Sequence, residues 1–287
     1  MNLSINQTTH FAINILNRHK HGVVHSVYRR TINLSFGGQL LALQSDCSPI
    51  SPISFITALD TSEMETLDIS VGDQVIVSKN KMTIIGSHEN YSFRYGQAKV
   101  HETKFVPNLN YEEIEQIRTI IQNILSHSNT NGFDLIFNGN LSENSPLAIQ
   151  AAGKRIKSGG NLLVKNHFTD AAKELSRLIG LGSGLTPSGD DFLCGLLAGA
   201  AILKLEQHPF ISSLTTLIKE HLQDTIDISA AFLACALQNK FSLAVNSLEA
   251  TPSYIEVKES FLAIGHSSGI DTLCGIYFAL DNFKVMA

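Results

Sequence analysis

Residues 180–195 read Gly-Leu-Gly-Ser-Gly-Leu-Thr-Pro-Ser-Gly-Asp-Asp-Phe-Leu-Cys-Gly and lead into an apolar run. Glycines tolerate positive φ angles and expose successive backbone N–H groups, and a helix start adds unpaired donors with a partial positive charge. A glycine-rich turn that opens a helix can therefore hold an anion. We predict such a site here, with Thr186, Asp190 and Asp191 as catalytic candidates. The binding candidates in this turn are Gly182, Ser183, Gly184, Ser188 and Gly189.

The same pattern returns near the C-terminus, where residues 265–275 read Gly-His-Ser-Ser-Gly-Ile-Asp-Thr-Leu-Cys-Gly. Aligned without gaps, residues 188–195 and 268–275 are identical at six of eight positions, each pair eighty positions apart. We expect two equivalent helix starts related by a pseudo-twofold axis, with both turns lining one cleft. The helices predicted at 190–205 and 271–280 are apolar almost all round and should be buried together. His266 is a further catalytic candidate, and Ser267, Ser268, Gly269 and Asp271 are further binding candidates.

Part of this repeat also has a purely structural interpretation. Ser188 with Asp191, and Ser268 with Asp271, have the spacing of capping boxes, in which hydroxyl and carboxylate satisfy the free N–H groups of a helix start. The turn is not a Walker A loop, because no Gly-Lys-Ser/Thr follows, and it is not a dinucleotide fingerprint, because no strand-helix-strand unit precedes it. Capping and ligand binding therefore both remain open for these residues.

The period of the apolar residues changes along the chain. Runs rich in β-branched residues predict strands within 22–34, 39–43, 73–78 and 81–85, preceded by a weak helix signal at 8–17. From Tyr111 on, apolar residues recur at helical spacing, and Phe133–Phe137 is expected as one added strand. We predict an α+β protein: a β-rich domain at 1–110, either a barrel or a small sheet, and a mostly α-helical domain at 111–287 that carries both glycine-turn helix starts. The further helices are expected at 114–125, 146–157, 169–179, 209–223, 228–238, 241–248 and 255–263.

The chain is sparsely charged: 16% of its 287 residues are Asp, Glu, Lys or Arg, and the formal net charge is −5. A low charge fraction favours contact with other subunits or self-association, and the negative balance argues against nucleic acid as a partner. No apolar run is long enough to span a membrane and no secretory leader precedes the first strands, so we expect a cytoplasmic protein without a membrane partner. The four cysteines have no metal-binding spacing and are expected to be buried thiols.

Three other features carry weaker signals. His25, in a strand-like run, is a candidate for substrate binding or a residue packed at a strand edge. Lys154, Arg155 and Lys157 form a compact basic cluster that either complements an anion or is a solvated face. No cofactor is required by the pattern; if a metal is bound, Mg²⁺ held by Asp190, Asp191 and Asp271 would fit, although capping explains these carboxylates equally well.

The motif at 180–195 resembles the signature of the AllH-type family, which is associated with oxamate carbamoyltransferase. The similarity extends to residues 22–27 and to residues 265–271, and so covers nearly the whole chain. This resemblance implies a cytoplasmic subunit of a multi-subunit enzyme of allantoin degradation, within purine catabolism. That enzyme converts oxalurate and phosphate into oxamate and carbamoyl phosphate.

These observations lead to one hypothesis and two rivals. In the first, the 182–189 turn binds phosphate, the 267–269 turn binds oxalurate, and carbamoyl transfer proceeds without a covalent enzyme intermediate. In the second, the chain is a non-catalytic scaffold whose glycine turns shape an interface. In the third, it is a stand-alone enzyme that acts on another small anionic metabolite.

Overall fold

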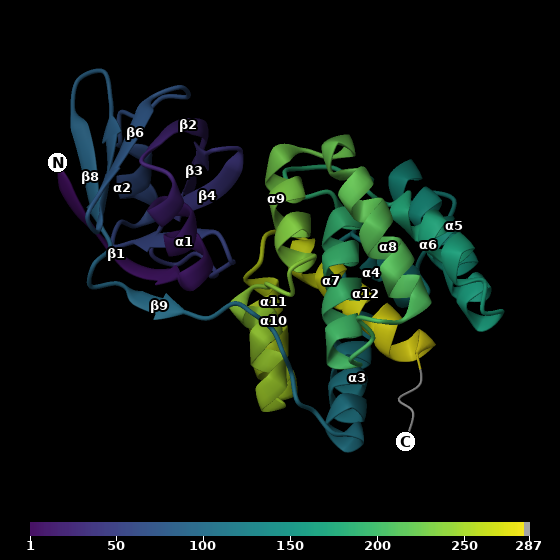
Figure 1. Cartoon of the computed structure of the whole chain (residues 1–287). Coiled ribbons are helices and arrows are strands. Elements are labelled where there is room, and N and C mark those ends of the chain that lie inside the picture. The colour runs from purple at the N-terminus through teal and green to yellow at the C-terminus, as the bar shows by residue number, and fades with distance from the viewer. Residues whose placement is uncertain (284–287) are drawn as a thin grey trace. The chain divides into compact units, whose positions relative to one another are not determined.

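The structure is a computed structural model that describes residues 1–283. The chain divides into two compact units, Met1–Thr103 and the residues from Lys104 on. The first is built mainly of strands and the second of helices, so the predicted α+β class is confirmed. Each unit is described by itself below (Figure 1).

The first unit is an eight-stranded barrel. Its hydrogen-bonded order is β5-β4-β3-β2-β6-β7-β8-β1, and it closes because β1 also pairs with β5, while β9 adds to β1. The elements are β1 (Asn2–Thr9), α1 (His10–Arg18), β2 (His21–Tyr28), β3 (Thr31–Phe36), β4 (Gln39–Gln44), β5 (Ser54–Thr57), α2 (Thr61–Glu65), β6 (Gln74–Ser78), β7 (Lys81–Ile85), β8 (Asn90–Arg94) and β9 (Lys99–His101).

Closure depends on an irregularity in β1. Residues Asn2–Ser4 run parallel to β8, and Ile5–Thr8 run antiparallel to β5, with a register shift between Ile5 and Gln7. A bulge bends the strand that contains it. The two halves of β1 can therefore pair with β8 and with β5, and this closes the barrel. The inside of the barrel is filled by buried apolar side chains, including Leu34, Leu41, Phe55 and Phe93.

The second unit is helical throughout the described residues. Its elements are α3 (Tyr111–Ser126), α4 (Asp134–Phe137), α5 (Leu147–Val164), α6 (Phe168–Ser176), α7 (Ser188–Ile202), α8 (Pro209–Glu220), η1 (Leu222–Asp224), α9 (Asp227–Ala236), α10 (Leu243–Asn246), η2 (Ser247–Ala250), α11 (Tyr254–Leu262) and α12 (Ser268–Asn282). The expected strand at 133–137 is wrong, because Asp134–Phe137 is the short helix α4. A five-residue apolar run does not distinguish strand from helix, and here the rings of Phe133 and Phe137 pack on Phe192.

The helices α7 and α12 form the middle of this unit and pack against each other (Figure 1). Both are buried on nearly all sides, which confirms the expectation from their composition. Their contacts are reciprocal: a Cβ on Gly195 would lie 1.9 Å from Thr272 O, and a Cβ on Gly275 would lie 1.9 Å from Phe192 O. Because Thr272 and Phe192 are themselves equivalent positions in the repeat, the helices cross as a pseudo-twofold relation requires.

None of the helices within residues 1–283 is long and apolar enough to cross a membrane.

Candidate functional site

The first glycine turn folds back onto its own helix. Gly180, Gly182 and Gly184 have φ angles of 70°, 141° and 93°, values that favour glycine. The turn closes through Gly189 N, which donates to Leu181 O at 2.9 Å. A Cβ on Gly189 would lie 2.0 Å from Leu178 O, so close packing explains this glycine. Residues 182–185, by contrast, are exposed, and a Cβ on Gly184 would meet nothing within 4 Å.

The predicted capping boxes are wrong. The N-cap residues are Pro187 for α7 and Ser267 for α12, and neither side chain caps its helix. Ser188 and Ser268 are already the first helical residues. The helices begin one residue earlier than a capping box needs, so the acidic residues of this motif lie too far along the first turn to reach back to it.

Asp190 connects the glycine turn to α9. Its Oδ1 accepts from Gly180 N at 2.9 Å, and its Oδ2 accepts from the hydroxyls of Thr225 at 2.5 Å and Ser229 at 2.6 Å. The residue is 1% exposed. Three donors surround this carboxylate, so its charge is satisfied within the protein and it holds the turn in place.

Asp191 has different surroundings. Its Oδ2 is inaccessible and has no hydrogen-bond partner among the described residues. Burial raises the pKa of Asp191 well above its ordinary range, and the charge of Asp271 raises this pKa further. The nearby hydroxyls of Ser268 and Thr186 act in the opposite direction and lower the pKa. Burial of this kind favours the protonated, neutral form of a carboxyl group.

Asp271 is the equivalent residue of the second turn, and it is fully buried. Its Oδ1 accepts from Phe133 N at 2.7 Å, whereas its Oδ2 has no partner among residues 1–283. Burial raises the pKa of Asp271 to about 6, although the hydrogen bond from Phe133 lowers it. The hydroxyls of Ser188 and Ser267 also lower it. Each acid is thus influenced by the serine that starts the other helix.

A hydrogen bond joins the two turns directly. The hydroxyls of Thr186 and Ser268 lie 2.7 Å apart, although these residues are far apart in the sequence. The structure therefore brings together Thr186, Ser188, Asp191, Ser268 and Asp271, as the repeat predicted. Gly269 supports this packing, because a Cβ there would lie 1.8 Å from Phe261 O.

The remaining predicted residues lie at other places. His266 is exposed beside Ser267, and Ser183 is exposed at the tip of the first turn. His25 belongs to the first unit, on β2, where its Nδ1 lies 3.1 Å from Ser26 Oγ. It is not among the residues that the second unit gathers.

The loop before α4 is a part of the site that the sequence did not reveal. Asp134 is fully buried and accepts from Thr130 N, Thr130 Oγ1 and Gly132 N at 2.7 to 2.9 Å. These bonds shape the loop so that Phe133 N points at Asp271. The polar residues around Gly132 are typical of such a turn. The apolar run that follows them was instead interpreted as a strand.

Metal and thiol chemistry receive little support from these side chains. Within residues 1–283, no three or more His, Cys, Asp or Glu residues are grouped so that they could hold a metal ion. The oxygens of Asp190 are directed at its three donors, so it does not share a ligand set with Asp191 and Asp271. Burial raises the pKa of Cys194 and of Cys274 well above the ordinary range, so neither is poised as a nucleophile. Cys47 is exposed, against the expectation that all four thiols are buried.

Two family models match the chain. Residues 178–280 match the model described as oxamate carbamoyltransferase subunit AllH, and residues 2–100 match the AllH family N-terminal domain. The chain belongs to the AllH family. No solved structure matches it. The first AllH match spans both glycine turns and the crossing of α7 and α12, and the second spans the barrel. The family description names a subunit, which implies companion chains in an assembled enzyme.

Proposed function

We propose that this AllH-family chain contributes a reaction centre to an oxamate carbamoyltransferase, which converts oxalurate and phosphate into oxamate and carbamoyl phosphate. The observation that carries the proposal is the meeting of two helix starts at a pair of buried carboxyl groups, Asp191 and Asp271, each with one oxygen that has no hydrogen-bond partner within residues 1–283. Buried polar atoms without partners are rare in folded proteins and are frequently found where a ligand binds.

The exposed part of the first turn supplies the anion site. The backbone of residues 182–185 is open to solvent, and it leads into the N-terminus of α7, whose partial positive charge favours phosphate. The Thr186 hydroxyl lies between this turn and Ser268. Phosphate at residues 182–186 would therefore lie beside Thr186, whose hydroxyl also acts on Asp191.

An ionised carboxylate beside phosphate would repel it, and the burial of Asp191 removes this difficulty. In this proposal Asp191 carries a proton when phosphate binds, in keeping with the burial that raises the pKa of Asp191 above its ordinary range. A neutral carboxyl group donates a hydrogen bond instead of repelling the anion. The same proton is then available for the reaction.

The chemical step balances with that proton. An oxygen of hydrogen phosphate forms a bond to the carbamoyl carbon of oxalurate, and the bond from this carbon to the inner amide nitrogen breaks. The electron pair stays on that nitrogen, which takes a proton from Asp191 and leaves as oxamate. Asp191 recovers a proton from the phosphate. General acid catalysis of this kind contributes about 100- to 10,000-fold to a rate.

The test uses the assembled enzyme with its companion subunits. Asp191→Asn keeps the shape of the side chain but cannot exchange a proton, so the rate of carbamoyl phosphate formation should fall by about 100-fold or more. Asp281→Asn is the matched control, because Asp281 lies on α12 with its side chain half exposed. Full activity of Asp191→Asn in an intact assembly would refute the catalytic role.

One observation favours the scaffold alternative. Close backbone packing accounts for Gly189, Gly195, Gly269 and Gly275 without any ligand. Gly184 distinguishes the phosphate-binding hypothesis from the scaffold hypothesis. It is exposed, has a φ of 93°, and a Cβ built on it would have no neighbour within 4 Å among the described residues. If the turn binds phosphate, Gly184→Ala should weaken the binding of inorganic phosphate, measured by calorimetry with and without Mg²⁺, while assembly is unchanged. A chain that binds no phosphate in either condition is a scaffold.

A further inference from the structure

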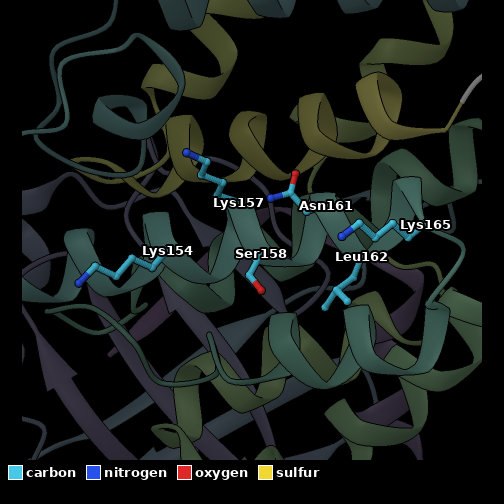
Figure 2. Close-up of a pocket in the computed structure, with 6 residues that line it drawn as sticks. All are labelled: Lys154, Lys157, Ser158, Asn161, Leu162 and Lys165. Atoms are coloured by element: carbon cyan, nitrogen blue, oxygen red, sulfur yellow. The ribbon is translucent and has the colours of Figure 1, made fainter.

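A basic stripe runs along one face of α5, a helix that belongs to neither glycine turn. Figure 2 shows the residues that line an open groove of about 390 Å³ on this helix. The lining consists of Lys154, Lys157, Ser158, Asn161, Leu162 and Lys165. Three of the six are lysines, and no carboxylate belongs to the lining.

The three lysines are not neutralised by the part of the chain that the structure describes. No salt bridge or hydrogen bond joins the side-chain ammonium group of Lys154, Lys157 or Lys165 to any residue within 1–283, and all three are exposed. Arg155, on the same helix, is different: its Nη1 lies 3.3 Å from Glu174 Oε1. One face of α5 is thus paired internally and the other leaves its positive charge free. In a chain with a formal net charge of −5, this is a local concentration of opposite sign.

The stripe is long and has apolar ends. From Lys154 to Lys165 it covers twelve residues, and the eleven steps between them rise about 16 Å along a helix. Residues seven apart return to nearly the same face, so Leu147 lies in line with Lys154, and Val164 lies in line with Lys157. Leu147 is 83% exposed and Val164 is 79% exposed. Large apolar side chains this exposed, on either side of a charged groove, are typical of a contact surface.

We propose that this face of α5 is the docking surface for an acidic, partly apolar segment of a companion subunit. Its carboxylates would meet Lys154, Lys157 and Lys165, and its apolar side chains would cover Leu147 and Val164. A small anion fits less well, because it spans only a fraction of the stripe and would leave both apolar ends uncovered. The lysines are also flexible point charges, which do not offer an anion the bidentate geometry of a guanidinium. Charge complementarity of this kind directs association and fixes the register of partners.

This proposal rests on the chain being a subunit and not on the chemistry at Asp191. Its test therefore measures the association of the subunits rather than the rate of the reaction. Lysines of the wild-type chain are acetylated with a water-soluble reagent, alone, with the companion subunits, and with inorganic phosphate, and the extent at each lysine is read by mass spectrometry. Protection of Lys154, Lys157 and Lys165 by the companion subunits but not by phosphate is the expected result. Lys20, Lys79 and Lys219, which are also exposed, serve as internal references.

A charge reversal then measures the contribution to affinity. The triple variant Lys154→Glu, Lys157→Glu, Lys165→Glu should weaken binding of the companion subunits by about tenfold or more, and least so at high salt. Lys20→Glu, Lys79→Glu, Lys219→Glu changes the net charge equally and should stay within about twofold of wild type. Unprotected lysines in an assembled complex, equal protection by phosphate alone, or unchanged affinity of the triple variant would each overturn the proposal.

Discussion

The first turns of α7 and α12 can be compared position by position, because the residues of one recur eighty positions later in the other. The comparison separates two neighbouring acids. Asp190 has Ile270 as its counterpart, and the structure surrounds Asp190 with three hydrogen-bond donors. Asp191 has Asp271 as its counterpart, and in both residues one oxygen is buried and has no partner in the part of the chain that the structure describes. The acid that only one helix carries positions a loop, whereas the acid that both helices carry keeps one buried oxygen without a partner among residues 1–283.

The largest effect is expected at the helix crossing. Gly195→Ala and Gly275→Ala would each place a Cβ 1.9 Å from a carbonyl oxygen of the other helix, and neither rigid backbone can move away. Each should lower the free energy of unfolding by more than about 4 kcal/mol, measured by urea denaturation. Gly160→Ala is the control: it lies in α5, its nearest neighbour would be the Asn282 side chain at 3.3 Å, and it should be close to neutral. A large loss of stability for only one of the two variants would contradict the pseudo-twofold relation between the helices.

The next effect distinguishes Asp190 from its counterpart. Asp190→Ala leaves the N–H of Gly180 and the hydroxyls of Thr225 and Ser229 without their acceptor, so it should cost about 3 to 4 kcal/mol of stability. Ile270→Val at the equivalent position removes one methyl group and should cost about 1 kcal/mol. Thermal unfolding of both variants measures the difference. Equal costs would mean that the three hydrogen bonds contribute little.

The buried carboxyl pair should give stability a pH dependence. The pKa of Asp271 is raised from an ordinary value of 3.8 to about 6, so between these values the folded chain binds more protons at this residue than the unfolded chain. Its contribution to stability is therefore fully present below about pH 4 and is lost as the pH rises through 6, a change of about 3 kcal/mol. Asp271→Asn still accepts from Phe133 N but does not titrate.

Asp271→Asn should consequently become more stable relative to wild type as the pH rises from about 4 to 7. Urea denaturation at a series of pH values gives the difference, with Asp281→Asn as the control because that side chain is 51% exposed. A difference that is the same at every pH would show that Asp271 titrates normally.

The smallest effect concerns the bond between the two turns. Thr186→Val removes the hydroxyl that lies 2.7 Å from Ser268 Oγ, and it should cost about 1 kcal/mol. A double-mutant cycle with Ser268→Ala isolates the interaction, since the coupling energy should account for most of that cost. Thr272→Val is the control, because its hydroxyl bonds only within α12. A coupling energy of zero would mean that the turns are held together by the helix crossing alone.

Much of the fold follows from local patterns. The change of period near residue 110 separates strands from helices, and the apolar composition of α7 and α12 requires burial wherever they pack. The repeat also identified Ser188, Asp191, Ser268 and Asp271 as one set. Barrel closure was harder to predict from the sequence, because it depends on one strand, β1, which pairs with β5 and β8 from distant parts of the chain.

The amino-acid sequence by itself thus determined the two kinds of unit, the paired helix starts and the residue types that meet there. Only the tertiary structure decided what each acid does. Asp190 and Asp191 are adjacent in the sequence and of the same residue type, and they differ because Thr225 and Ser229 donate hydrogen bonds to Asp190. Likewise the loop that brings Phe133 N to Asp271 joins residues 138 positions apart. Periodicity reports which side of an element is buried, whereas the hydrogen-bond partner of a buried carboxylate depends on which distant backbone the packing places beside it.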